Sequence, residues 1–330
     1  MSLSTKYRPI SFAEVIGQRP IISILSRQVA TKTWKHVYLF DGCHGCGKTT
    51  VARILANEIN HGEGEPIEID AASNNGVDNI RSLIIDAQQS SIDCDYKIYI
   101  IDECHQLTKA AWDAALKLIE EPPFGAIFIF CTTNPQKVPK TIMSRVQRFT
   151  FKKVSKDEIA GRLAYILNED FPNIKYETTA LNRIAALSDG HVRDAIQHLD
   201  KCLSYSVDIT LDLVESTLGL ASYECIVQAV NAIIDMDVEA FIKVLQLFDA
   251  SGVSILEVYD DIINYTIDMA IYSKTGNLSC TNISPDVKGT INKNDKFSKL
   301  VTRLLEYRKF ADQNNASALL KTICIEFSEE

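Results

Sequence analysis

The chain has 330 residues, of which 46% are apolar, so it is long enough for two or three domains with hydrophobic cores. Its net charge of −9 argues against a protein that coats nucleic acid through bulk charge, although a few cations suffice to hold phosphates. We expect a soluble, cytoplasmic protein with no membrane contact, because no signal peptide or membrane-spanning apolar run is visible and the nine cysteines, which do not suggest a disulfide framework, fit a reducing compartment.

The stretch DGCHGCGKTT, residues 41–50, admits two interpretations. Cys43 and Cys46 have the spacing of a redox pair or of half a zinc site. A zinc site needs further ligands, and the other cysteines stand singly with no His-x-x-x-His partner, so we expect no zinc.

The same ten residues fit the P-loop pattern, Gly-x-x-x-x-Gly-Lys-Thr, between a β-forming run at 36–40 and a helical pattern at 49–59. Glycines let backbone N–H groups point at a phosphate, Lys48 neutralises β- and γ-phosphate oxygens, and the Thr49 hydroxyl binds Mg²⁺. The alternative is a glycine-rich turn without a ligand. The loop residues expected to bind ATP are Gly42, Gly45, Cys46, Gly47, Lys48, Thr49 and Thr50.

A second signal is YKIYIIDECHQL, residues 96–107, where a continuous apolar strand ends in two carboxylates. Such strands belong in parallel sheets that bind ligands at their carboxyl ends, which places Asp102 and Glu103 beside the P-loop. There Asp102 is expected to hold Mg²⁺, partly through water, and Glu103 to orient and polarise the attacking water. An acidic pair that merely caps a strand is the alternative.

Further elements complete an α/β domain. A third apolar strand at 125–131 ends in Thr132, Thr133 and Asn134, and a strand at 66–73 precedes a helix at 76–88. An amphipathic helix at 108–121 is stopped by two prolines. The first 150 residues are therefore predicted to form a doubly wound nucleotide domain.

The rest of the chain has a helical pattern. The segment 154–208 opens with a capping box, Ser155 with Glu158, and continues with two short amphipathic helices. Beyond it, apolar stripes at helical spacing indicate a core, and some of them suit a subunit interface.

These motifs together resemble the ATPase subunits of sliding-clamp loaders in the AAA+ superfamily, bacterial DNA polymerase III gamma/tau above all and, more distantly, the replication factor C small subunit. The matching segments are KYRPISFAEVIGQ, HVYLFDGCHGCGKTTVARILA, IEIDAAS, YKIYIIDECHQLTKAAWDAALKLIEEPP, CTTNPQKVPKTIMSRVQRF and LSDGHVRDAIQHLDK. The resemblance implies an α/β P-loop AAA+ domain at 1–153, a small helical lid domain with sensor 2 at 154–208, and a helical collar at 209–330.

The resemblance also implies a function. The chain is expected to be an ATPase motor that uses ATP and Mg²⁺ to open a sliding clamp and load it on primer-template DNA during replication. Its expected partners are identical or related loader subunits in a ring or spiral of five.

Residue roles follow from the same resemblance. Thr133 matches sensor 1, which reads the γ-phosphate, and Arg193 matches sensor 2, which links lid closure to the nucleotide. The segment expected to surround adenine and ribose contains Tyr7, Arg8, Pro9, Val15 and Ile16.

Arg145, in TIMSRVQRF, matches the arginine finger that reaches into a neighbouring subunit's ATP site, with Val146 in place of the family's usual cysteine. Such a finger contributes about 10³ to 10⁵ in rate. The alternative is that Arg145 pairs with a carboxylate of its own subunit.

The family's four-cysteine zinc module is absent between the P-loop helix and IEIDAAS, where only NEINHGEGEP stands. This gap and the end at residue 330 suggest a minimal loader of viral origin, which would place it in the host cytoplasm. Asn79, Arg81 and Lys109 lie near helix starts that suit DNA contacts, or are plain surface groups.

Three other classes compete with the clamp loader. The DECH box also occurs in helicases, but those need a second sheet domain, and the helical second half supplies none. A non-hydrolysing scaffold subunit would not need Lys48, Asp102, Glu103, Arg145 and Arg193 together. Another AAA+ remodeller, such as a branch-migration motor, shares the P-loop and the acidic pair but would not be expected to carry the EEPP…TTNPQK…SR series.

Overall fold

A computed structural model describes residues 2–89, 94–206, 208–277, 281 and 296–329. The chain divides into two compact units, Met1–Asp208 and Ile209–Glu330. Each unit is described by itself.

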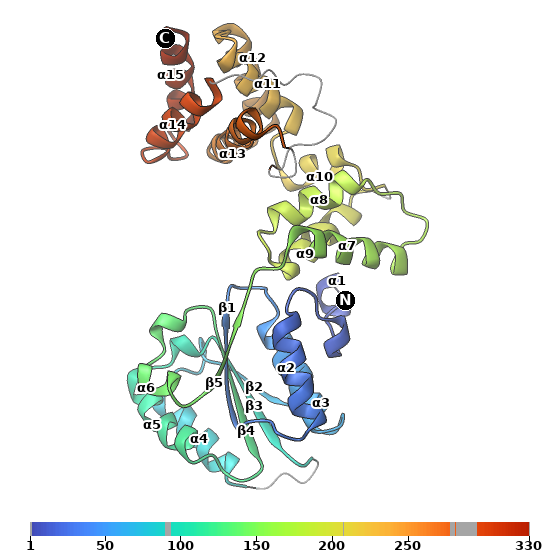
Figure 1. Cartoon of the computed structure of the whole chain (residues 1–330), viewed down its shortest axis with the longest axis vertical. Coiled ribbons are helices and arrows are strands. Elements are labelled where there is room, and N and C mark those ends of the chain that lie inside the picture. Colours follow the sequence, from blue (N-terminus) through green and yellow to red (C-terminus); the bar gives the residue numbers. More distant parts are fainter. Residues whose placement is uncertain (1, 90–93, 207, 278–280, 282–295, 330) are drawn as a thin grey trace. The chain divides into compact units, whose positions relative to one another are not determined.

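Unit 1 is built on a five-stranded sheet with the order β2-β3-β4-β1-β5, in which every neighbouring pair is parallel (Figure 1). The strands are β1 (Val37–Gly42), β2 (Ile67–Asp70), β3 (Lys97–Asp102), β4 (Ala126–Thr132) and β5 (Gln147–Phe151). Four of the five were expected from the sequence, whereas β5 was not.

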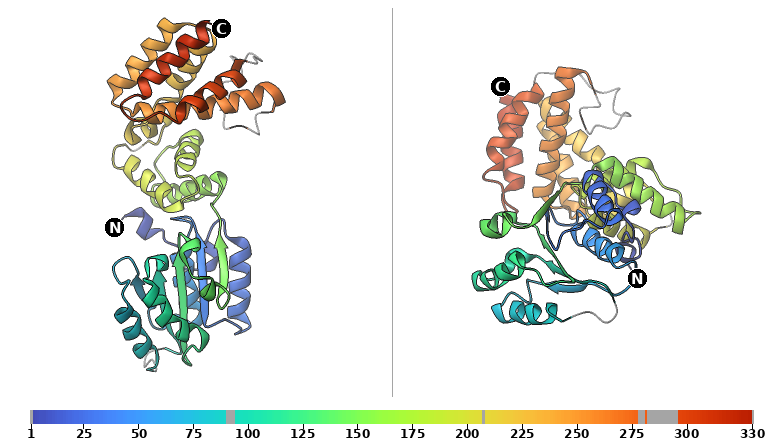
Figure 2. Two further views of the ribbon diagram at one scale, coloured as in Figure 1. Left: turned by 90° about the vertical axis from the view of Figure 1, so that its left-hand side faces the viewer. Right: turned by 60° about the horizontal axis from the view of Figure 1, so that its bottom comes forward.

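Helices cover both faces of this sheet (Figures 1 and 2). Tyr38 and Phe40 pack with α2 and α3, and the alternate residues Val37 and Leu39 pack with α4, α5 and α6. The helices are α1 (Leu3–Lys6), α2 (Arg19–Ala30), α3 (Lys48–Ile59), α4 (Val77–Ala87), α5 (Lys109–Glu120) and α6 (Lys140–Met143), with 3₁₀ turns η1 (Phe12–Glu14), η2 (Cys104–Gln106) and η3 (Pro135–Lys137).

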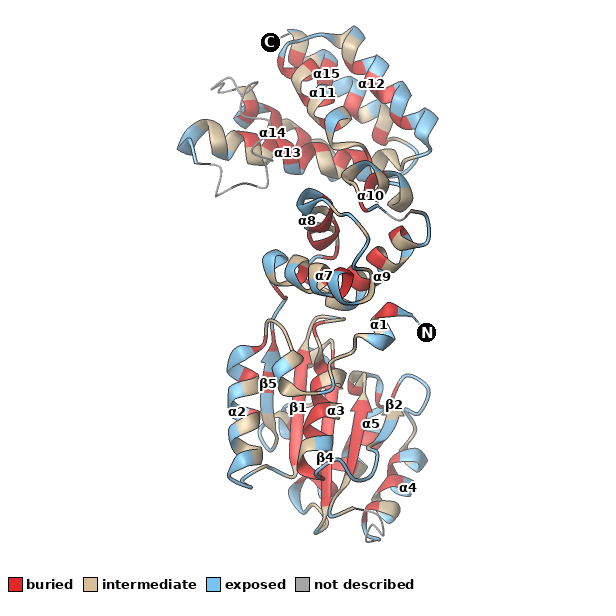
Figure 3. Ribbon diagram, turned by 90° about the vertical axis from the view of Figure 1, so that its right-hand side faces the viewer, coloured by how far each residue is buried: buried red, intermediate tan, exposed pale blue. Residues whose placement is uncertain are grey.

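Burial of the strands is greatest in the centre of the sheet and lower at its edges. The central strands β1, β3 and β4 are buried along most of their length, whereas the edge strand β2 is largely exposed (Figure 3). Continuous apolar runs are what a parallel sheet covered on both faces requires, which is why β1, β3 and β4 were readable from the sequence.

Three further helices belong to unit 1: α7 (Lys156–Asp170), α8 (Thr178–Leu187) and α9 (Val192–Leu203). The predicted capping box is present, because Ser155 accepts from the Glu158 N–H and the Glu158 side chain accepts from the Ser155 N–H. The chain's first residues hold these helices, since Leu3 N donates to Asp200 at 3.2 Å. The finer boundary between 153 and 154 stays a prediction.

Unit 2 is helical, as its apolar stripes predicted. Its helices are α10 (Leu211–Leu218), α11 (Tyr223–Ile234), α12 (Val238–Ser251), α13 (Ile255–Thr275), α14 (Lys296–Arg308) and α15 (Ala316–Glu329). The last five of them, α11 to α15, pack around one core that includes Phe241, Tyr259 and Leu320. Among the described residues no single helix is long and apolar enough to cross a membrane; α10 with α11 passes that test only as a pair bent by 85°.

An ion pair joins β1 to the edge strand β5. Asp41 is buried, and its carboxylate accepts from Arg148 Nε at 2.6 Å, from Arg148 Nη2 at 3.0 Å and from Thr150 Oγ1 at 3.1 Å. Because Asp41 lies immediately before the P-loop, this pair fixes the strand from which the loop departs.

We predict that Arg148→Ala lowers the free energy of unfolding of unit 1 by about 2–3 kcal/mol, because it leaves a buried carboxylate with one hydroxyl partner. Urea unfolding followed by tryptophan fluorescence measures this, since both tryptophans, Trp34 and Trp112, lie in unit 1. The matched control is Arg81→Ala, which removes an exposed pair with Asp78 and is expected to cost under about 1 kcal/mol. Equal losses in the two variants would contradict the prediction.

Candidate functional site

The carboxyl ends of β1, β3 and β4 meet at one edge of the sheet. Asp41 lies opposite Thr132, and Ile101 lies opposite Phe130. The P-loop after β1, the carboxylates after β3 and the polar residues after β4 are therefore neighbours, as expected for ligand sites in parallel sheets.

The P-loop needs its glycines for two physical reasons. Gly42, Gly45 and Gly47 have φ values of +148°, +66° and +101°, which side chains rarely tolerate. A Cβ on Gly42 would also lie 2.5 Å from the carbonyl oxygen of Phe151, so β5 approaches the loop too closely for any other residue.

Lys48 begins α3 and is buried, with 6% of its surface exposed. Its ammonium donates to the carbonyl oxygens of Gly42 at 3.1 Å and Cys43 at 2.7 Å. A buried ammonium at the N-terminus of a helix makes a strongly anion-attracting position.

The two P-loop cysteines serve as packing residues. Cys46 is buried with α2, α3 and the sheet, and its thiol donates to the Cys43 carbonyl oxygen at 2.9 Å. Burial raises the pKa of the Cys46 thiol to about 12, whereas a zinc ligand must be a thiolate. Within the described ranges no cluster of three or more His, Cys, Asp or Glu side chains has the geometry to hold a metal.

Asp102 and Thr49 lie side by side. Thr49 Oγ1 donates to Asp102 Oδ2 at 2.7 Å, and the other carboxylate oxygen accepts from Glu103 N at 2.9 Å. A hydroxyl and a carboxylate are hard oxygen ligands of the kind that Mg²⁺ prefers, so the donor set fits this ion.

Glu103 has a left-handed backbone (φ 47°) at the end of β3. Its Oε2 accepts from Thr133 Oγ1 at 2.9 Å and lies 3.1 Å from His105 Nδ1. The structure thus brings Thr133 to the acidic pair, although Thr133 does not line the cleft described next.

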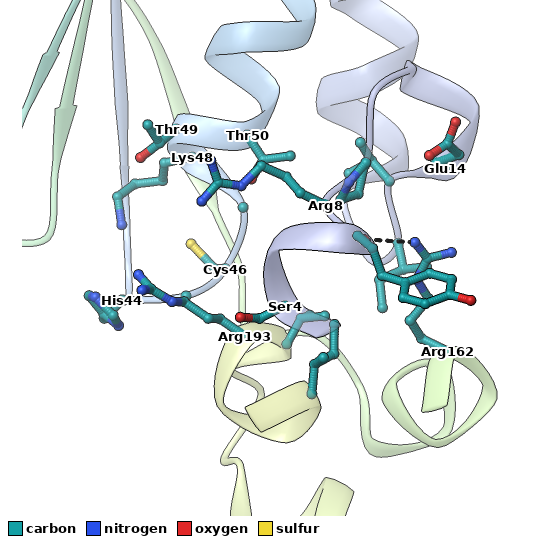
Figure 4. A pocket seen from close by; sticks show the side chains of 18 of the residues that line it. Ser4, Arg8, Glu14, His44, Cys46, Lys48, Thr49, Thr50, Arg162 and Arg193 are labelled. Carbon is teal, nitrogen blue, oxygen red and sulfur yellow. Dashed lines mark hydrogen bonds between the residues drawn. The ribbon is translucent and has the colours of Figure 1, made fainter. Parts of the chain in front are cut away.

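A cleft at this edge collects the expected nucleotide-binding residues, and Figure 4 shows their side chains approaching from the P-loop, the N-terminal segment and α9. Gly42 does not line the cleft, but its carbonyl oxygen binds Lys48. The lining includes Tyr7, Arg8, Pro9, Val15, Ile16, Gly45, Cys46, Gly47, Lys48, Thr49, Thr50, Asp102, Glu103 and Arg193.

The cleft is positively charged despite the acidity of the chain. Burial and then the nearby Arg53 guanidinium lower the pKa of Arg8, and Arg193 lies close enough to add to the effect. The N-terminus of α9 also approaches the P-loop directly, because a Cβ on Gly45 would lie 3.2 Å from the Cβ of His191, the residue before α9. Clustered cations of this kind favour a polyanionic ligand.

Arg162, on α7, lines the same cleft and was not anticipated from the sequence. Its Nη2 donates to the Tyr7 carbonyl oxygen at 3.0 Å, and its guanidinium lies 5.8 Å from the ring of Tyr7 and 5.1 Å from that of Tyr165. No local motif marks it, because its partner Tyr7 is 155 residues away in sequence. Likewise missed were the lining residues Ser4, Glu14, His44, Val192 and Ile196, and His105, which contacts Glu103 but does not line the cleft.

Arg145 lies outside the cleft, after α6. Its Nε pairs with Glu120 Oε1 at 2.7 Å, and its Nη1 donates to the Thr141 carbonyl oxygen at 2.8 Å. In the isolated chain Arg145 thus has the own-subunit carboxylate partner that the sequence left open, and the finger role stays a prediction. Asn79, Arg81 and Lys109 are exposed.

Sequence comparison relates the chain to replication proteins. A family model described as DNA polymerase III, delta subunit, matches residues 61–155. The chain is 35% identical over 342 aligned residues to DNA polymerase III subunit tau of Bacillus subtilis (strain 168), covering 97% of this chain and 57% of that protein. It is 33% identical over 297 residues to DNA polymerase III subunit gamma/tau of Mycoplasma genitalium, covering 83% and 49%. The chain spans about half the length of these relatives.

Among solved structures, the Thermotoga maritima RuvB Holliday junction branch migration motor superposes with a TM-score of 0.54 at 20% identity, covering 78% of this chain and 90% of that one. A point mutant of the same Thermotoga maritima protein gives 0.53 at 21% identity, covering 69% and 80%. At such identities the likeness concerns the fold, which is the AAA+ fold expected from the sequence: a P-loop domain with a parallel sheet, followed by helical regions.

The sequence relatives decide between the families that share this fold. Identity of 33–35% to gamma/tau subunits extends over most of the chain, whereas RuvB shares only the fold at about 20%. The resemblance seen in the motifs is therefore confirmed, and the chain is a homologue of the DNA polymerase III gamma/tau subunits that carries their AAA+ P-loop domain.

Proposed function

We propose that this chain is the ATPase motor subunit of a sliding-clamp loader, which uses ATP and Mg²⁺ to open a clamp and place it on primer-template DNA. One observation carries the proposal. In a homologue of gamma/tau subunits, the P-loop, the Asp102–Glu103 pair and the lid residue Arg193 line one cationic cleft, with Thr133 hydrogen-bonded to Glu103.

Each residue has a defined task in this proposal. Lys48 and the α3 N-terminus bind the β- and γ-phosphates, and Thr49 and Asp102 hold Mg²⁺, partly through water. When bound, Mg²⁺ neutralises charge on the phosphate oxygens. The segment Tyr7–Pro9, with Val15 and Ile16, surrounds adenine and ribose.

In this proposal ATP hydrolysis depends on residues at the carboxyl ends of β3 and β4. Glu103 orients and polarises the attacking water, and Thr133 reads the γ-phosphate. Arg193 couples the lid, α7–α9, to the nucleotide, since the lid already lies against Gly45.

The ATP site is completed by a residue from an adjacent subunit. Arg145 serves the ATP of an adjacent subunit in a ring or spiral of five, and unit 2 forms the collar of that assembly. Its pair with Glu120 does not oppose this role, because both side chains are about 40% exposed and such pairs contribute little.

A first prediction from this function concerns the binding and hydrolysis of ATP. Lys48→Ala is expected to weaken the affinity for a fluorescent ATP analogue with Mg²⁺ at least about 100-fold, because it removes the buried ammonium. Glu103→Gln is expected to keep that affinity and lower the hydrolysis rate by at least about 100-fold. Titration and phosphate release measure the two effects, and Lys175→Ala, an exposed lysine outside the cleft, is the control.

The loader function is tested by adding partner subunits, sliding clamp and primer-template DNA to the same assay. Hydrolysis is expected to rise strongly only when clamp and DNA are both present. Full stimulation by DNA without a clamp would reject the loader in favour of a different DNA remodeller.

A second prediction concerns the finger. In assemblies with adjacent copies of this chain, Arg145→Ala alone and Lys48→Ala alone are expected to lose at least about 10³-fold in rate. A mixture of the two variants should recover part of the rate, because a site with Lys48 intact then meets a neighbour with Arg145 intact. Recovery only with wild-type protein would mean that Arg145 does not act in trans.

A third prediction concerns Arg162. Arg162→Ala is expected to weaken ATP-analogue affinity about 5- to 20-fold, because it removes the hydrogen bond and cation–π contacts that tie α7 to the Tyr7 segment. Arg162→Lys keeps the charge but not the planar guanidinium group, so its ATP-analogue affinity should lie between that of the wild type and that of Arg162→Ala. Unchanged affinity in Arg162→Ala would show that this contact does not order the adenine side of the cleft.

A further inference from the structure

His105 has no role in the function proposed above, yet it touches the side chain on which hydrolysis depends. Its Nδ1 lies 3.1 Å from Glu103 Oε2, and the imidazole is only 9% exposed. The same carboxylate oxygen accepts from Thr133 Oγ1 at 2.9 Å and from Thr133 N at 3.4 Å. In the described part of the chain, no hydrogen bond engages Oε1 of Glu103.

The contacts around the ring indicate which nitrogen carries a hydrogen. The carboxylate of Glu103 can only accept, so a hydrogen on Nδ1 makes its close contact with Oε2 favourable. Nε2 lies 3.2 Å from Gln106 Nε2, and an amide nitrogen only donates, so Nε2 must accept. A hydrogen on Nδ1 and a lone pair on Nε2 suit both contacts, and Nδ1 shares that hydrogen with Thr132 Oγ1.

The ring is also tied to the next strand. His105 Nδ1 lies 3.1 Å from Thr132 Oγ1, and this buried hydroxyl accepts from Asn134 N at 3.0 Å. His105 therefore bridges the end of β3 to the end of β4.

The backbone explains why Glu103 needs such support. Its left-handed conformation, φ 47°, is unusual for a non-glycine residue and persists only where surrounding contacts hold it. In the η2 turn the chain reverses direction, and Gln106 N donates to the Glu103 carbonyl oxygen at 2.9 Å. This turn places His105 against the carboxylate of Glu103, the residue two positions before it.

We propose that His105 is a positioning residue for Glu103. The Thr133 hydroxyl donates to Oε2 and His105 Nδ1 lies against the same oxygen, so the two hold Oε2 at the edge of β4 and leave Oε1 to accept the proton of the attacking water. The inference rests on the proposed ATPase function, and it adds a residue that binds neither nucleotide nor metal.

The test compares His105→Ala with His105→Asn in the complete assembly. We expect His105→Ala to lower kcat about 10- to 100-fold, the effect of losing one polar contact to a charged group, while ATP-analogue affinity changes less than about twofold. His105→Asn keeps an N–H donor near the position of Nδ1 and should recover kcat to within about threefold of wild type. His61→Asn, at an exposed histidine in the turn after α3, is the matched control.

The other outcomes are distinct. An unchanged or increased kcat in His105→Ala overturns the inference, an increase meaning that the histidine restrains Glu103. Equal losses of kcat, ATP-analogue affinity and Tm in both variants overturn it too, because the role is then structural. If Glu103→Gln hydrolyses ATP normally, the proposed function itself fails and the inference falls with it.

Discussion

The candidate site depends on the burial of three parallel strands from both sides. β1, β3 and β4 carry apolar side chains on both faces, so a shift in strand register would expose or misplace core residues. The register in turn fixes which residues leave the sheet together at its carboxyl edge. The P-loop, Asp102 and Thr133 derive their proximity from the core, to which the P-loop itself contributes Cys46 and, in part, Cys43.

The charge of the cleft differs in sign from the net charge of the chain. A chain with net charge −9 places Arg8, Lys48, Arg162 and Arg193 in one cleft, together with the carboxylates of Glu14, Asp102 and Glu103. Burial is the main cause of the lowered pKa of Arg8, and repulsion from the nearby Arg53 and Arg193 guanidinium groups adds to it. The arrangement is relieved when phosphate oxygens share the cleft, so nucleotide affinity and closure of the lid helices are expected to be coupled.

The sequence predicted those parts of the fold that are encoded locally. Each of these parts combines an apolar pattern with signal residues at the end of an element. They are the P-loop, the strands ending at Asp102 and Thr132, and the capping box at Ser155, and each is present in the structure. The strand β5 was missed because only Phe149 and Phe151 of its five residues are buried, which is too short an alternation to stand out. The helix α2 was missed because it buries only Ile21 and Leu25.

The contacts that refine the site could not be predicted, because they join residues far apart in sequence. Arg162 meets Tyr7, and His105 meets Thr132, only after the sheet and the lid have formed. The DECH box was recognised only as a motif shared with helicases, and nothing in it indicates the partner of His105, which is set by the neighbouring strand.

Arg145 shows why an isolated chain and an assembled one need not use the same contacts. A solvent-exposed pair such as Arg145–Glu120 contributes at most about 1 kcal/mol, because water screens both charges and solvates them well when they separate. A phosphate oxygen in a water-poor subunit interface offers the same guanidinium a stronger, bidentate partner. The donation from Nη1 to the Thr141 carbonyl oxygen meanwhile restricts the side chain near α6. The weak pair with Glu120 therefore keeps the proposed finger ordered at the surface without competing seriously for it.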